Sequence, residues 1–204
     1  MKEFIIYLII IIVSYLLGSV SSSILVSKAL FKLDIRKYGS GNAGATNVAR
    51  VFGITSGLLT LAGDLLKTVI SMMIGMWLMG DSGEAIAGLA CIIGHCWPVL
   101  FKFEGGKGVA VGCAIALMMD WRVCILLVLI FAVVVMITRT VSIASLTATF
   151  TFPPLLILFG ERDPLTIALS VIVVIIIYVQ HRGNIARIIA HKEPKFELKK
   201  KKDS

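Results

Sequence analysis

The sequence is poor in acidic residues and almost free of charge over long stretches. Its 204 residues hold 12 Asp and Glu against 20 Lys and Arg, and 58% of them are apolar. Residues 4–27 include no charged side chain, and a helix of that length spans about 36 Å, more than the roughly 30 Å hydrocarbon core of a bilayer. Soluble domains interrupt their apolar runs with polar residues, so this uninterrupted run excludes a soluble protein. We predict a single polytopic membrane domain over residues 1–204, with 4–27 as its first span rather than a cleavable signal peptide.

Several common catalytic and metal-binding motifs are absent. The four cysteines form no C-x-x-C pair and no zinc pattern, and no G-x-S-x-G elbow is present. Glycine follows Lys107 in the G-G-K-G stretch, so it is not a P-loop. Leu100 stands where an acid would complete a His-x-x-x-x-Asp motif beginning at His95. The carboxylates that might hold Mg²⁺ are scattered, at Asp34, Asp64, Glu104 and Asp120. We therefore expect no metal and no cofactor, and chemistry by positioning and electrostatics on a substrate that arrives activated.

Seven apolar segments predict an all-α integral membrane protein with about seven transmembrane helices. The segments are 4–27, 54–79, 85–101, 109–119, 123–137, 141–159 and 164–180. The fourth and fifth are short and are separated by the polar Asp120-Trp121-Arg122, which suggests a tilted or partial span beginning in a pocket. Seven spans place the two termini on opposite sides of the membrane.

The distribution of the basic residues predicts the orientation of the protein in the membrane. Sixteen of the 20 fall on one side of the predicted spans: Lys28, Lys32, Arg36, Lys37, Arg50, Lys102, Lys107, Arg139, Arg182, Arg187, Lys192, Lys195 and Lys199 to Lys202. The positive-inside rule places that side in the cytoplasm, so the N-terminus is outside and the C-terminus is cytoplasmic. The connector at 80–84 is then an external turn. The basic cytoplasmic tail, 192–204, is expected to be attracted to anionic lipid.

Four polar motifs share the cytoplasmic side. They are DIRKYGSGNAGATNVARVFG (34–53), GHCWPVLFKFEGGKGVAVG (94–112), RTVSIASL (139–146) and HRGNIARI (181–188). Glycine-rich segments let backbone N–H groups converge on an anion, and Arg and Lys supply the opposite charge. Two such loops on one face predict two anionic groups, or one group held from both sides. The alternative is that these glycines only allow helices to pack closely.

Two other functions compete with an enzyme acting on an activated donor. A membrane transporter of an organic phosphate or anion would also need basic loops, but the polar motifs lie on one face only and the sequence shows no inverted repeat. A transferase that uses a nucleotide-linked lipid donor would need a carboxylate-rich metal site, which is missing.

The motifs GSGNAGATNVAR (preceded by DIR), GHCWPVLFKFEGGKGVA and HRGNIARI occur in the order and spacing of a known family. The chain resembles the bacterial acyl-phosphate-dependent glycerol-3-phosphate acyltransferases, the PlsY family, over nearly its whole length. It departs from the family's usual pattern in two places. Val20-Ser21 follows Gly18-Ser19 where the family usually has Ile-Pro, which removes a proline kink, and Gly183 stands where the family often has an acid.

The resemblance implies a seven-helix enzyme of the bacterial cell membrane, with its site facing the cytoplasm. Such an enzyme moves a fatty acyl group from acyl-phosphate to the 1-hydroxyl of glycerol 3-phosphate, giving lysophosphatidic acid and phosphate in the first acylation of phospholipid synthesis. The expected partners are these two substrates and membrane lipids, without metal or nucleic acid, and the expected state is a monomer.

The resemblance also assigns roles to residues, in three groups. Those expected to act in catalysis, by hydrogen bonding and positioning the substrates, are His95, Ser40, Asn42 and Asn184. Those expected to bind substrate phosphate are Arg50, Lys107, Thr46, Asn47, Gly105, Gly106 and Gly108. Those expected to shape the pocket are Arg139, Ser142, Ser145, Asp64 and Lys67. Because the last two lie three apart in an apolar span, they predict a buried ion pair.

Overall fold

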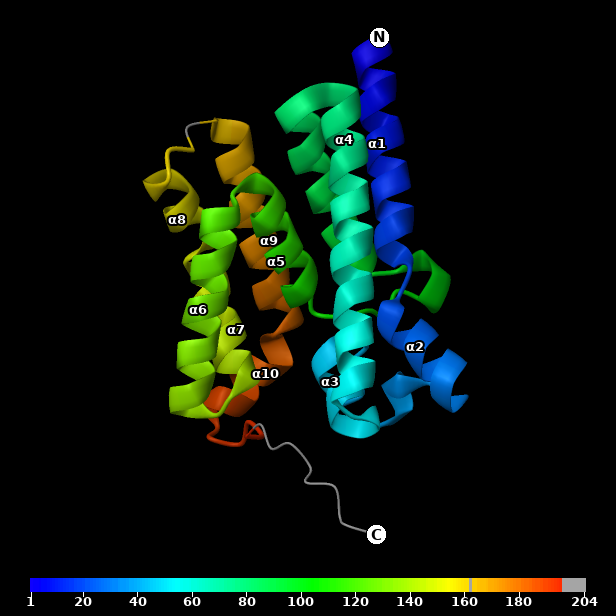
Figure 1. The fold of residues 1–204 in the computed structure, drawn as a ribbon, viewed down its shortest axis with the longest axis vertical. Helices are drawn as coiled ribbons and strands as arrows, with labels where there is room; N and C mark the ends of the chain where they lie inside the picture. Colours follow the sequence, from blue (N-terminus) through cyan, green and yellow to red (C-terminus); the bar gives the residue numbers. More distant parts are fainter. Residues whose placement is uncertain (162, 196–204) are drawn as a thin grey trace.

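The protein is all-helical in the part of the chain that a computed structural model describes, residues 1–161 and 163–195. The α-helices in chain order are α1 (Lys2–Ser19), α2 (Ser22–Phe31), α3 (Ala45–Phe52), α4 (Ile54–Cys96), α5 (Val109–Met119), α6 (Trp121–Thr138), α7 (Val141–Phe150), α8 (Phe152–Leu158), α9 (Pro164–Gln180) and α10 (Arg182–Ile189). Short 3₁₀ turns occur at Ile35–Lys37 and Val99–Phe101. The predicted all-α class is thus confirmed (Figure 1).

Several of the described helices are long and apolar enough to cross a bilayer. Four segments meet that test: Lys2–Phe31, Ile54–Phe101, Trp121–Thr138 and Val141–Leu158. The pair formed by α9 and α10, bent by 61°, makes a fifth if it is one span. Large apolar side chains such as Leu66, Leu129 and Ile175 are more than half exposed, as suits helices whose outer faces meet lipid rather than water.

Helix α4 is a hairpin of two antiparallel arms. Met79 and Gly80 leave the helical region, and Gly80 takes φ 61°, a conformation that glycine adopts at no steric cost. Gly75 and Gly83 then meet backbone to backbone, and a side chain on either would clash with the other arm. The hairpin is visible at the top of Figure 1.

The two arms of α4 correspond to the predicted spans 54–79 and 85–101. The predicted connector 80–84 is correct in place but too long, since the turn lies at Met79 and Gly80 and the second arm includes 81–84. The second arm also ends earlier than predicted, at Cys96, because Pro98 cannot continue the helix two residues later.

The first predicted span, 4–27, is broken at Val20 and Ser21, although no proline is present. Lys67, on the first arm of α4, explains the break. Its Nζ donates to the carbonyl oxygens of Gly18 at 2.9 Å and Val20 at 2.7 Å. The lysine therefore provides partners for the carbonyls that the break leaves without helical ones.

The bounds of the predicted segments 109–119 and 164–180 match those of the helices α5 and α9, and the other predicted bounds differ. The predicted span 141–159 is divided into α7 and α8, because Pro153 and Pro154 occupy the first turn of α8. Helix α6 begins at Trp121, earlier than predicted, since Asp120 caps it by accepting from the backbone N–H of Arg122 at 2.8 Å. Of the stretch Asp120-Trp121-Arg122, Asp120 is thus the helix cap and the other two residues begin α6.

The helices form two groups that stand side by side, α1 to α4 and α5 to α10 (Figure 1). A buried apolar cluster joins them through the second arm of α4, with Ile92 and Ile115 packed together with Phe152 and Ile177. Three of the four polar motifs, 34–53, 139–146 and 181–188, lie at the end of the molecule where α3 and α10 lie, away from the α4 turn, and the fourth, 94–112, lies nearer mid-height (Figure 1).

Candidate active site

A cavity of about 1130 Å³ lies between the two helix groups. Residues from α3, α4, α7 and α10 and from the loops before α3 and α5 give it a polar part, and apolar side chains such as Leu127, Phe131 and Phe152 line the rest. A cavity with this division suits a molecule that has a charged head and an apolar chain.

Most of the predicted site residues line this one cavity. They are Ser40, Asn42, Thr46, Asn47, Arg50, Asp64, His95, Lys107, Gly108, Ser142, Ser145 and Asn184. Gly105 and Gly106 lie against His95, and Lys67 lies beside Asp64. Arg139 is the exception, because it is exposed at the end of α6 and does not line the cavity.

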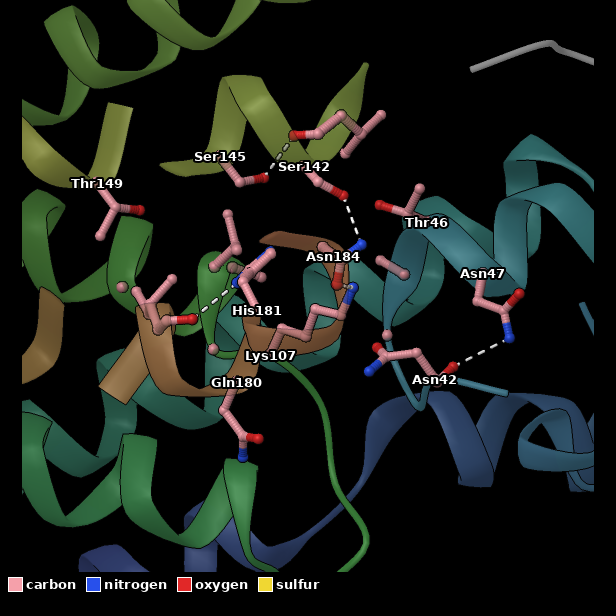
Figure 2. Close-up of a pocket in the computed structure, with 18 of the residues that line it drawn as sticks. Asn42, Thr46, Asn47, Lys107, Ser142, Ser145, Thr149, Gln180, His181 and Asn184 are labelled. Carbon is pink, nitrogen blue, oxygen red and sulfur yellow. Dashed lines mark hydrogen bonds between the residues drawn. The ribbon is translucent and has the colours of Figure 1, made fainter. Parts of the chain in front are cut away.

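The first glycine-rich motif is held in shape by Asn47. Its Oδ1 accepts from the backbone N–H of Ser40 at 2.9 Å, and its Nδ2 donates to the carbonyls of Tyr38 and Asn42, both at 3.0 Å (Figure 2). Both amide hydrogens of Asn47 are therefore used within the loop. The side chain fixes the geometry of the loop rather than offering donors to a ligand.

Only the first half of that motif is a loop, because α3 begins at Ala45. Arg50 lies in the last turn of α3 and lines the cavity. Its guanidinium makes no hydrogen bond or ion pair with any of the described residues. A planar cation of this kind is suited to bind a phosphate in bidentate fashion.

The second motif brings Lys107 into the cavity. Its Nζ donates to Oδ1 of Asn184 at 2.6 Å (Figure 2), which joins the loop before α5 to α10. Burial is the main cause that lowers the pKa of Lys107 to about 8; the charge of Glu193 opposes it, and the charges of Arg187 and Arg50 add to it. The ammonium is therefore held where an added anion would stabilise it.

Two helix N-termini open on the cavity. It is lined by Gly44, Ala45 and Thr46 at the start of α3, and by Gly108 and Val109 at the start of α5. The first backbone N–H groups of a helix have no partner within it and carry partial positive charge. Both starts can therefore bind anions.

Arg36, in the DIR sequence before the first motif, connects the two loops. It pairs with Asp34 at 2.8 Å, and its Nη1 donates to the carbonyl of Phe101 at 3.1 Å and to Glu104 at 3.2 Å. The resemblance gave DIR no role, and the contacts assign it to holding the two loops together.

Glu193 enters the site from beyond α10, and its side chain is only 8% exposed. Its carboxylate accepts from Ser142 Oγ and Asn184 Nδ2, both at 2.5 Å, and from Arg187 Nε at 2.7 Å. Burial alone would raise the pKa of Glu193, but hydrogen bonds from Ser142, Asn184 and Arg187 hold it below its usual value. The second residue of the predicted tail 192–204 therefore belongs to the site, whereas the tail's lysines at 199–202 lie outside the described residues.

His181 is a second cavity residue that sequence reasoning missed. It is 2% exposed, and its Nδ1 lies 2.8 Å from the carbonyl oxygen of Ile177. A carbonyl only accepts, so Nδ1 carries the proton and Nε2 is left as an acceptor. His181 is the first residue of the HRGNIARI motif, so the motif could have identified it as a site residue. Glu193 had no such sequence signal, because it is surrounded by lysines.

The predicted buried ion pair is confirmed. Asp64 Oδ1 lies 3.0 Å from Lys67 Nζ, and the two side chains are 2% and 7% exposed. Ser22 Oγ donates to the same carboxylate oxygen at 2.9 Å. His95 joins the pair, with its Nδ1 3.0 Å from Lys67 Nζ.

Apolar spans surrounding a cavity that is rich in cations, helix N-termini and glycine loops define an integral membrane protein with an internal anion site. A family model described as glycerol-3-phosphate acyltransferase matches residues 8–191. The chain belongs to this family.

Curated relatives and solved structures agree. A glycerol-3-phosphate acyltransferase of Thermoanaerobacter pseudethanolicus is 40% identical over 92% of this chain and 94% of its own length, and one of Finegoldia magna is 38% identical over 93% and 96%. The crystal structure of PlsY, an integral membrane glycerol 3-phosphate acyltransferase, in its glycerol 3-phosphate form superposes with a TM-score of 0.88 at 33% identity, covering 94% of this chain and 96% of that one. Its lysophosphatidic acid form gives 0.87 at 32% identity over the same shares.

Proposed function

We propose that this protein transfers a fatty acyl group from acyl-phosphate to the 1-hydroxyl of glycerol 3-phosphate. The products are lysophosphatidic acid and phosphate, and the reaction starts phospholipid synthesis in a bacterial cell membrane. One observation carries the proposal: Lys107, Asn184 and Arg50, which has no partner among the described residues, come from three distant motifs and line one cavity that also has an apolar wall. That combination fits two phosphate-bearing substrates, one of which has a fatty chain.

The reaction needs no covalent intermediate with the enzyme, because the donor is a mixed anhydride. The 1-hydroxyl oxygen of glycerol 3-phosphate attacks the acyl carbonyl carbon, and the bond from that carbon to the phosphate oxygen breaks. The leaving phosphate takes the electron pair of that bond and also takes the hydroxyl proton. The protein supplies orientation and electrostatic stabilisation.

Each of two cationic groups binds one of the two substrate phosphates. Lys107 and the backbone N–H groups of the 105–108 loop, apart from that of Gly106, which donates to the carbonyl of His95, hold the phosphate of glycerol 3-phosphate. Arg50, with Ser40, Thr46 and the start of α3, holds the phosphate of the donor. Because the two groups face the same cavity, the hydroxyl and the acyl carbonyl are brought together.

The amides and His95 position the glycerol part. Asn184 and Asn42 hydrogen-bond the glycerol backbone, and His95 orients the substrate without taking its proton. Ser142 and Ser145 shape the wall on α7, where Ser142 accepts from Asn184 Nδ2 at 2.7 Å.

We also propose seven spans, with the N-terminus outside and the C-terminus and site in the cytoplasm. The hairpin of α4 supports this number, because its arms count as two spans. The protein acts as a monomer, and its basic tail contacts anionic lipid. Cysteine-accessibility labelling at positions 82 and 195 should report opposite sides, and labelling from one side would contradict the topology.

Purified protein, synthetic acyl-phosphate and radiolabelled glycerol 3-phosphate test the function directly. The expected product is labelled lysophosphatidic acid, with equal release of phosphate, and both should fall in Arg50→Ala and Lys107→Ala. Product formed from acyl-CoA but not from acyl-phosphate would refute the donor. Uptake of labelled glycerol 3-phosphate into proteoliposomes without acylation would instead establish a transporter.

A further inference from the structure

Lys67 has a role that its ion pair with Asp64 does not explain. An ammonium has three hydrogens to donate. The carbonyl oxygens of Gly18 and Val20 take two of them, at 2.9 and 2.7 Å. The third is available to two acceptors at 3.0 Å, Oδ1 of Asp64 and Nδ1 of His95.

Asp64 does not depend on that third hydrogen, because Ser22 Oγ already donates to the same carboxylate oxygen at 2.9 Å. In the part of the chain that the structure describes, Nδ1 of His95 has no other close partner: Asp64 Oδ1 lies 3.6 Å away, beyond hydrogen-bond length. The nearest polar atom to Nδ1 is thus a donor. Nδ1 must accept, and a neutral ring that accepts at Nδ1 carries its proton on Nε2.

Nε2 of His95 lies where the two glycine-rich loops meet. A side chain on Gly106 would collide both with His95 Nε2 and with the carbonyl oxygen of Ala43 in the first loop. The backbone N–H of Gly106 donates to the carbonyl of His95 at 3.1 Å. His95 therefore contacts the second loop through both its ring and its backbone. His95 also lines the cavity.

We propose that Lys67 is a positioning residue that holds His95 as the Nε2–H tautomer, so that this N–H donates to the glycerol 3-phosphate phosphate beside Gly106. The inference rests on the proposed function for the identity of that phosphate. Lys67 itself does not touch the substrate. It acts through the imidazole, and it sets the tautomer through a hydrogen bond that also ties His95 to the break between α1 and α2.

The tautomer is measured directly by ¹⁵N NMR of the full-length protein labelled at histidine, in detergent micelles. His95→Gln assigns the His95 resonances by their loss. We expect the wild-type His95 to show a protonated Nε2 and a bare Nδ1, and Lys67→Met to show a mixture of tautomers. A wild-type His95 that is protonated at Nδ1 would overturn the proposal, even if Lys67→Met does not fold.

Steady-state kinetics separates positioning from a structural role. Lys67→Met should raise the KM for glycerol 3-phosphate by about tenfold or more, the usual effect of losing a hydrogen bond to a charged group, while kcat changes by less than about twofold. His95→Gln should do the same, and the double variant should be no worse than either single one, because both remove the same interaction. Additive effects of the two substitutions, or an unchanged KM, would refute the link through His95.

Lys28→Met is the matched control, since Lys28 is an exposed lysine on α2 that does not line the cavity. It removes the same charge and should leave KM unchanged. If the wild-type protein transfers no acyl group, the proposed function fails. The NMR measurement still decides whether Lys67 sets the tautomer.

Discussion

Raising the pH from 7 to 9 should weaken the capture of glycerol 3-phosphate by this protein. Lys107 is the reason, because burial lowers its pKa to about 8. A buried lysine binds phosphate only while it is charged, and its charged form is lost as the pH rises through that value. The phosphate of the substrate has a second pKa of about 6 and stays a dianion over the whole range. The change in binding over this pH range therefore reflects the protonation of the enzyme and not that of the substrate.

The size of the effect follows from the fraction of charged lysine. With a pKa of about 8, roughly nine tenths of Lys107 is charged at pH 7 and roughly one tenth at pH 9. kcat/KM for glycerol 3-phosphate reports the free enzyme and should fall by roughly eight- to tenfold between these values. Lys107→Met should start about ten- to a hundredfold lower at pH 7, the equivalent of about 1.5–3 kcal/mol for a charge-assisted hydrogen bond, and should lose this pH dependence.

The assay measures phosphate release at limiting glycerol 3-phosphate, with hydrolysis of acyl-phosphate subtracted at each pH. Lys107→Arg is the matched variant, because a guanidinium stays charged up to pH 12 and beyond. Its profile should be flat from pH 7 to 9 even if its rate is lower. A flat wild-type profile, or an equal decline in Lys107→Arg, would refute the assignment of Lys107 to the substrate phosphate.

Three further substitutions test the architecture of the site. Gly106→Ala should raise the KM for glycerol 3-phosphate, because its new methyl group displaces the ring of His95; kinetics on protein with an unchanged Tm checks this, and a normal KM would contradict it. Glu193→Gln should lower the Tm in a thermal unfolding assay, because a neutral amide loses the ion pair with Arg187 and leaves its buried partners poorly paired, at a cost of about 1–3 kcal/mol; a Tm equal to that of wild type would remove Glu193 from the list of supporting residues. Gly83→Leu should reduce the yield of monodisperse protein in size-exclusion chromatography, because the arms of α4 can no longer touch, and a normal yield would show that the hairpin tolerates separation.

The sequence was sufficient to predict the class and most of the cavity, because glycine loops and cations at fixed spacing have few other uses in an apolar chain. Arg50, Lys107 and Asn184 were chosen from three separate motifs, and all three line one cavity. The buried pair of Asp64 and Lys67 was also predictable, because two opposite charges three apart in an apolar span have no better partner nearby.

What the sequence did not reveal depends on contacts between distant segments. The missing proline gave no reason to expect a break in the first span, but Lys67, from another helix, donates to the carbonyls of Gly18 and Val20 where the helix breaks. Glu193 looked like one acid in a basic tail until the chain end returned to Ser142. The predicted connector between the arms of α4 was too long because two glycines allow a tighter turn than polar composition indicates.

The contacts of Lys67 also bear on the order in which the chain can enter a membrane. A lysine near the middle of a span is costly to insert, at about 2.5–3.5 kcal/mol. Synthesis runs from the N-terminus, so the carbonyls of Gly18 and Val20 are in place before Lys67 leaves the ribosome, and Asp64 precedes it by one turn. Each of these three acceptors is thus made before the donor that needs it. His95, which depends on Lys67 for its orientation, follows only when the second arm of α4 arrives, so the polar centre of this protein can be assembled in the same sequence in which it is translated.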